Sequence, residues 1–149
     1  MHTAAEIADY FLATVDDEAG DSMSNLKLQK LVYYAQGFHL ALTGKPLFND
    51  PIMAWEHGPV VPTLYHGFKQ HGGEPIPRPE NGVDESNYSK EVREILNEVF
   101  DEYGQFSPWK LRNLTHEEPP WREAYPTHGE ISQASMRRYF STLVHEQTA

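Results

Sequence analysis

The chain has 149 residues, 39% of them hydrophobic, no cysteine and a formal net charge of -10. This length suffices for one domain with its own core, and the lack of cysteine excludes disulfides, thiolate metal ligands and a cysteine nucleophile. The acidic balance disfavours direct binding to nucleic-acid phosphates. It suits a basic protein partner, or it simply keeps a cytoplasmic protein soluble.

No apolar run reaches the length of about 18 residues that a membrane-spanning helix needs. The first residues are acidic rather than basic, so we expect no secretory leader. Together with the absence of cysteine, these features predict a cytoplasmic protein without a membrane partner.

The first two predicted elements are helices. Thr3 and Glu6 form a capping box that opens the first one. The second helix covers residues 25–43 and ends at Gly44, a typical C-terminal cap. Because apolar residues cover most of the circumference of the second helix, we expect it at the centre of the core.

Lys27 is the unusual residue of this second helix, since it lies on the same side as Leu31, Tyr34 and Phe38. One interpretation is that its long stem snorkels to solvent from the start of the helix. The other is that a carboxylate under the neighbouring loop holds its ammonium group, and Glu56 is a candidate for that carboxylate.

The segment after the second helix is predicted to contain a small β-hairpin or a pair of short strands. The turn signal Asn49-Asp50-Pro51 separates two short apolar runs there. Pro59 disfavours helix at Gly58, and Pro62 fits the first turn of a third helix. A loop over residues 74–87 follows.

A fourth helix over residues 88–104 has an apolar stripe and, on another face, an acidic stripe. The acidic stripe consists of Glu91, Glu94, Glu98, Asp101 and Glu102. It is either a solvated outer face or a docking site for a basic patch of a partner protein. We take Glu94 and Glu98, like charges one turn apart, as the candidate partner-binding residues of this helix.

Three further helical pieces complete the chain: one over 108–116, a brief one around Trp121, and a final one over about 132–146, capped by Ser132. The elements together predict a mainly α fold. We expect a single compact domain over residues 1–149, with about six helices around the central one and one small β-hairpin.

Catalytic and metal-binding patterns are weak, although the chain has eight histidines. His66 and His71 are five residues apart, so they face different ways on a helix, and no HExxH motif or nucleophile elbow is present. We therefore predict no metal, no cofactor and no enzymatic activity. A hydrolase or metalloenzyme assembled from distant residues is the alternative of a different class.

The corner between the hairpin and the third helix is a candidate binding platform. Glycine and proline restrict its path, and a rigid surface loses little entropy on docking. We take His57, Tyr65 and His66 as its exposed partner-binding candidates and expect Trp55 to anchor it in the core. The alternative is a turn that only defines the fold.

The two remaining tryptophans have different predicted roles. Trp121, beside two prolines, is expected to fill the core. Trp109 lies on a short amphipathic helix with Leu111 and Leu114, where it is a candidate interface anchor, because tryptophan is enriched among binding hot spots.

Several blocks occur in a distinctive order: K-L-Q-K-L-x-Y-Y-A-Q, P-L-F, A-W-x-x-G-P-V, Y-x-x-F-K and, later, T-H-x-x-x-P-W. This series resembles the Panacea antitoxin domain, which includes SocA-type antitoxins and GepA-like prophage-linked proteins, over about residues 4–125. The motif residues that we expect to build the domain are Lys27, Gln29, Lys30, Tyr34, Trp55, Gly58, Pro59, His116 and Trp121.

The resemblance implies a non-enzymatic antitoxin of a bacterial or phage toxin–antitoxin pair, which neutralises a cognate protein toxin by direct contact. With the acidic stripe, it favours a toxin with a basic surface. The alternative is an adaptor that delivers the toxin to an AAA+ protease. An oligomer is compatible with either role, and we see no added DNA-binding module through which the protein would regulate its own operon.

Overall fold

The computed structural model of the chain describes residues 1–16 and 22–148, with side chains of the last helix described up to Val144. In this part the mainly α prediction is confirmed, since seven α-helices accompany one two-stranded sheet. The elements are α1 (Ala4–Thr14), α2 (Asn25–Thr43), β1 (Met53–Trp55), β2 (Gly58–Val60), α3 (Pro62–Phe68), α4 (Lys90–Tyr103), α5 (Pro108–His116), α6 (Pro119–Ala124) and α7 (Gln133–Thr148). Single turns of 3-10 helix occur at Lys69–His71, Glu85–Asn87 and Tyr125–Thr127.

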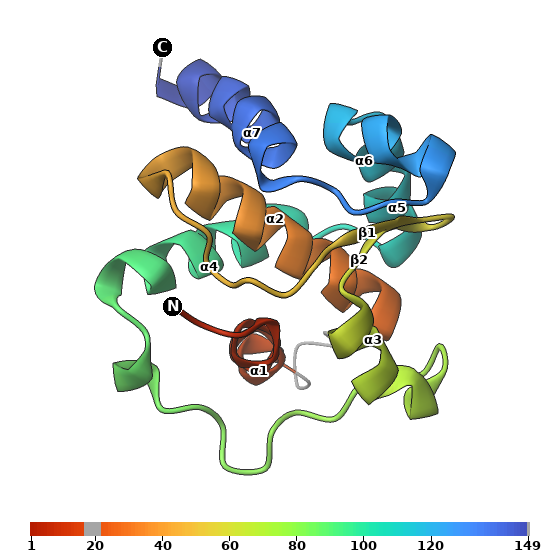
Figure 1. Cartoon of the computed structure of the whole chain (residues 1–149). Coiled ribbons are helices and arrows are strands. Elements are labelled where there is room, and N and C mark those ends of the chain that lie inside the picture. The colour runs from red at the N-terminus through yellow and green to blue at the C-terminus, as the bar shows by residue number, and fades with distance from the viewer. Residues whose placement is uncertain (17–21, 149) are drawn as a thin grey trace.

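The α2 helix passes through the middle of the molecule, where it contacts α1, α3, α4, α5, α7 and β2 (Figure 1). Every residue from Leu28 to Phe38 is buried, as the apolar circumference predicts. The α7 helix packs closely because Gly37 lies against the ring of Phe140, and a Cβ at position 37 would overlap that ring. The prediction of a central buried helix is confirmed.

Side-chain caps fix most of the helix starts. Thr3 and Glu6 form both hydrogen bonds of the predicted capping box, and Ser24, Ser89 and Ser107 each accept from a backbone N–H in the first turn of their helix. The predicted bounds of the fifth helix agree with the structure to the residue. The local hydrogen-bonding chemistry of the sequence therefore positions the helices well.

The β-hairpin is present, but our placement of its turn was wrong. Trp55 pairs with Gly58 and Met53 with Val60, so the chain turns at Glu56–His57 and not at Asn49-Asp50-Pro51. Gly58, with φ of 108°, supplies the left-handed backbone that a tight turn between strands favours. The Asp50 carboxylate instead accepts from the backbone N–H of Ala4 and from the Thr63 hydroxyl, both at 3.0 Å.

The described helices include none that is both long and apolar enough to cross a membrane.

Residues 129–131 run beside β1 and make a strand-like contact with it. Ala54 donates to the carbonyl of Gly129 at 2.9 Å, and Ile131 donates to that of Ile52 at 2.7 Å. These bonds connect the hairpin to the segment that leads into α7 (Figure 1).

Candidate partner-binding surfaces

A buried polar chain attaches the hairpin and α3 to the start of α2. The amide group of Gln29 accepts from the backbone N–H of Val61 at 2.9 Å and donates to the Asn25 side chain at 2.9 Å. Asn25 in turn donates to the carbonyl of Tyr65 at 3.2 Å. Because Asn25 and Gln29 are both buried, these bonds satisfy groups that would be costly to leave unpaired.

Lys30 is completely buried, and its ammonium group donates to the carbonyl of Pro59 at 3.1 Å. A Cβ on Gly58 would lie 2.6 Å from Lys30 Cε and 2.8 Å from Thr115 Oγ1, so the hairpin, α2 and α5 meet here without room for a side chain. Burial, and to a lesser extent the nearby Arg112 guanidinium, lower the pKa of Lys30 from 10.5 to about 7.

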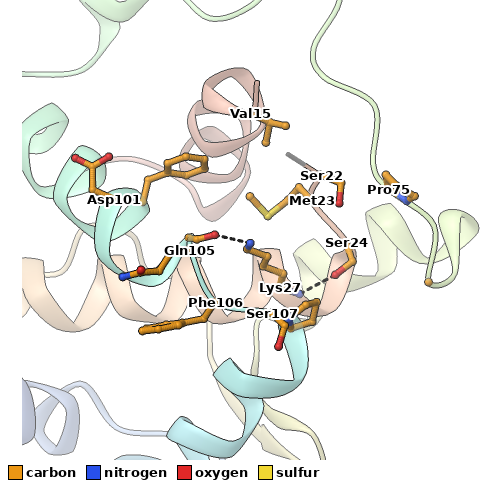
Figure 2. Close-up of a pocket in the computed structure, with 14 residues that line it drawn as sticks. Val15, Ser22, Met23, Ser24, Lys27, Pro75, Asp101, Gln105, Phe106 and Ser107 are labelled. Carbon is orange, nitrogen blue, oxygen red and sulfur yellow. Dashed lines mark hydrogen bonds between the residues drawn. The ribbon is translucent and has the colours of Figure 1, made fainter. Parts of the chain in front are cut away.

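Lys27 occupies a different site. Its ammonium group donates to the carbonyl of Gly104, just after α4, and it lines a hollow of about 670 Å³ (Figure 2). Glu56 lies at the hairpin turn and lines another hollow, so the proposed Glu56 contact was wrong. The reason is the helical phase of α2, which directs position 27 toward the end of α4 and position 30 toward the hairpin.

Glu118 is a buried acceptor that our sequence reasoning did not single out. Its carboxyl oxygens accept from the hydroxyls of Tyr33 at 3.0 Å and Tyr34 at 2.8 Å. Burial raises the pKa of Glu118 from 4.5 to about 7, although the tyrosine hydrogen bonds lower it in part. Two adjacent tyrosines on a helix that is buried all round were the available signal, because buried hydroxyls need a partner.

The predicted core role of Trp121 agrees with the structure. Trp121 is buried, stacks on His116 with ring centroids 3.8 Å apart, and donates from Nε1 to the carbonyl of Trp55 at 2.8 Å. Burial, followed by the Arg112 charge, lowers the pKa of His116. Trp55 itself is only partly buried, because its ring packs edge-on against Tyr65 and His66 and lines a solvent-facing hollow. Our expectation that Trp55 anchors the core was therefore wrong, and Trp121 has that role.

Side chains from three separate segments gather on one face around the hairpin. We call this group the aromatic surface, and it consists of Trp55, His57, Tyr65, His66 and Trp109. Trp55 contacts Tyr65 edge-on at 5.1 Å between ring centroids, and His57 lies 5.8 Å from Trp109. The Trp109 side chain is 55% exposed, and the Arg112 guanidinium covers its ring at 4.6 Å.

The aromatic surface borders a solvent-facing hollow of about 500 Å³. Trp55, His57 and Tyr65 line it together with the buried amides of Asn25 and Gln29. The structure thus brings together four of the side chains that we proposed as partner contacts: His57, Tyr65, His66 and Trp109. His57 and His66 are exposed, but our expectation of an exposed Tyr65 was wrong, because that side chain is half-buried against Trp55. Sequence reasoning missed Arg112, whose spacing of three residues from Trp109 on a helix was the signal for a stacking pair.

The two acidic candidates lie elsewhere, on α4. Glu94 and Glu98 are exposed, and Glu94 approaches Lys90 at 4.0 Å. Glu98 borders a smaller hollow of about 210 Å³ between α2, α4 and α7, which we call the acidic groove. Its lining residues are Phe38, Leu42, Ile95, Glu98, Val99, Glu102, Tyr103 and Val144.

Among the described side chains, no three histidine, aspartate or glutamate residues lie close enough together to hold a metal ion. The described surfaces offer exposed rings, a stacked guanidinium and carboxylates to a partner.

Comparison with known proteins identifies the family. The model of the SocA-like antitoxin, Panacea domain, matches residues 28–122, a narrower range than the 4–125 that we predicted. Antitoxin SocA of Caulobacter vibrioides (strain NA1000 / CB15N) is 48% identical over 50 residues, which cover 34% of this chain and 27% of that relative. No solved structure matches. Since the family model covers more than half of its residues, the chain belongs to the Panacea domain family of SocA-like antitoxins.

Proposed function

We propose that this protein is a non-catalytic antitoxin that neutralises a cognate protein toxin by binding it directly through the aromatic surface. Membership of an antitoxin family supports a toxin as the partner. The observation that carries the choice of surface is Trp109, a large ring that remains 55% exposed beside His57 and under Arg112. Tryptophan and arginine are the residues most enriched among binding hot spots.

The support beneath the aromatic surface favours tight binding. Gln29 and Asn25 hydrogen-bond the backbone at both sides of the corner, at Val61 and Tyr65, and Lys30 holds Pro59 from below. A surface whose backbone is fixed in this way loses little conformational entropy when a partner docks. A cysteine-free protein that binds a toxin made in the same cell would act in the cytoplasm.

The test is co-expression with the gene adjacent to this one, in a host that lacks both genes. Growth is scored and the two proteins are co-purified, with the wild-type chain, Trp109→Ala and the conservative Trp109→Phe. We expect rescue and a stable stoichiometric complex for wild type, impaired rescue and a weaker complex for Trp109→Ala, and partial recovery of both for Trp109→Phe. Circular dichroism should show the same helix content in all three, because Trp109 is exposed.

Other outcomes distinguish the alternatives. Rescue without a complex, accompanied by protease- and ATP-dependent loss of the toxin, would indicate an adaptor for an AAA+ protease. Full rescue by Trp109→Ala would contradict toxin binding through the aromatic surface. A toxic neighbour that wild type does not neutralise would contradict the antitoxin function itself.

A further inference from the structure

The acidic groove is an apolar depression with charged edges. Phe38 and Leu42 of α2, Ile95 and Val99 of α4 and Val144 of α7 line it. Leu42 is 51% exposed, one of the few large apolar side chains of the described chain with such exposure. An exposed leucine beside other apolar side chains, rimmed by charge, is typical of a protein-interaction site rather than of ordinary surface.

The size of the acidic groove indicates which kind of ligand it can bind. Its volume of about 210 Å³ is below the roughly 300–1,000 Å³ of most small-molecule pockets. It can accept one or two apolar side chains from a partner while the rest of that partner stays outside. The groove lies between α2, α4 and α7, and such a position between helices suits a partner helix that lays its apolar face into a groove.

The negative charge around the groove indicates that its partner is positively charged. Glu98 and Glu102 line it, and neither carboxylate forms an ion pair with any described side chain. They are like charges one turn apart, as are Glu94 and Glu98, and each such pair destabilises the helix slightly. A cation supplied by a partner would relieve this repulsion, because opposite charges across an interface favour association.

We propose that the acidic groove binds an amphipathic helical segment of the toxin that carries lysine or arginine beside its apolar residues. The proposal rests on the proposed function for the source of the segment. It assigns that segment to a second surface, since the groove lies along the C-terminal half of α2 and the aromatic surface at its N-terminal half. Apolar residues at i, i+4 and i+7 would face Leu42 and Val99.

A synthetic peptide tests the recognition chemistry without the toxin. The probe is a helical peptide of about 18 residues, longer than the minimum for a marginally stable helix, with leucines at i, i+4 and i+7 and lysines beside them. Its control has every lysine replaced by glutamate. In NMR titrations we expect the lysine peptide to shift the backbone amides of Leu42, Glu98 and Val144, and the glutamate peptide to leave them unchanged. No shift, or shifts confined to other parts of the molecule, would overturn the proposal.

Charge-reversal variants sharpen the peptide test. Glu98→Lys/Glu102→Lys should weaken binding of the lysine peptide at least about tenfold, equivalent to 1.4 kcal/mol. The matched control is Glu74→Lys/Glu80→Lys, which changes the net charge equally at exposed loop positions outside the groove and should change affinity less than about threefold. Equal weakening by both pairs would show that net charge alone attracts the peptide, and would contradict the groove.

The co-expression assay then tests the toxin as the source of the segment. We expect Glu98→Lys/Glu102→Lys to impair neutralisation and Glu74→Lys/Glu80→Lys to preserve it. Neutralisation unchanged by the groove variant, with the peptide still bound there, would overturn the assignment to the toxin and leave the proposed function intact. If wild type neutralises nothing, the proposed function fails, and the peptide titration decides the chemistry of the groove independently.

Discussion

The aromatic surface and the acidic groove lie along the same central helix but rest on different kinds of interior. Beneath the aromatic surface, Gln29 and Lys30 hold the hairpin corner by directional hydrogen bonds. Beneath the acidic groove, α2, α4 and α7 meet through apolar side chains and rings such as Phe38 and Tyr103. Hydrogen-bonded buried groups tolerate little displacement, whereas apolar contacts of conserved volume allow some repacking.

This difference predicts which substitutions should affect each surface. The aromatic surface should depend on residues below it that no partner touches, while the acidic groove should depend mainly on the side chains that line it.

The largest effect is expected for Gly58→Ala. A Cβ there would overlap Lys30 Cε and Thr115 Oγ1, and φ of 108° is unfavourable for alanine. Strain and overlap each cost about 2 kcal/mol, so unfolding free energy should fall by about 4 kcal/mol in urea titrations. Gly67→Ala is the control, since nothing lies within 4 Å of its Cβ. A similar loss in both variants would contradict the tight hairpin–α2–α5 junction.

Lys30 should make the stability of the protein depend on pH above pH 7. Its pKa is lowered from 10.5 to about 7, so between these values the unfolded chain binds a proton that the folded chain does not. Stability should therefore rise with pH, by roughly 2 kcal/mol between pH 7 and 9. Lys30→Met should lose this rise, as measured by urea unfolding at several pH values. The exposed Lys69→Met is the control that should retain it.

Glu118 should have the opposite effect at lower pH, where it makes stability fall as pH rises. Because its pKa is raised from 4.5 to about 7, the folded chain keeps a proton that the unfolded chain has lost between these values. Stability should fall by roughly 2 kcal/mol from pH 5 to pH 7. Glu118→Gln should flatten this slope, and the exposed neighbour variant Glu117→Gln should not. Identical slopes in both variants would mean that Glu118 does not titrate as a buried group.

Trp109→Ala should weaken toxin binding about tenfold, or 1.4 kcal/mol, measured by calorimetry with the purified toxin. Its effect on unfolding free energy should stay within about 0.5 kcal/mol, because the exposed ring contributes little to the core. Trp121→Ala is the opposite case and should cost about 3 kcal/mol of stability or more. A Trp109→Ala protein that loses stability instead of affinity would place this ring in the fold rather than the interface.

The smallest stability effect is expected on the acidic face. Glu94→Lys/Glu98→Lys should change unfolding free energy by less than about 0.5 kcal/mol, since both carboxylates are exposed. The association rate with a basic partner should fall, and its dependence on salt should weaken. If the association rate of the wild-type protein does not change with salt concentration, charge does not contribute to recognition of the partner.

Features whose interactions lie within one element could be predicted from the order of the amino acids. Periodicity located α4 and its acidic stripe, and local caps such as Thr3 with Glu6 gave the helix starts. The all-round apolar pattern of α2 indicated its central place. Each of these depends on residues a few positions apart, whose geometry follows from the helix alone.

Features that join distant segments could not be predicted in this way, because they depend on how the whole chain packs. Tyr34 meets Glu118 across 84 residues, and Trp109 meets His57 across the two intervening α-helices α3 and α4. Only glycine fits at position 58, because Lys30 and Thr115 fill the space that a Cβ would occupy. Helical periodicity could not tell whether Lys27 or Lys30 is the buried lysine, because both face the interior side of α2. That choice depends on which distant carbonyl each ammonium reaches, and the packing of other segments against α2 sets those positions.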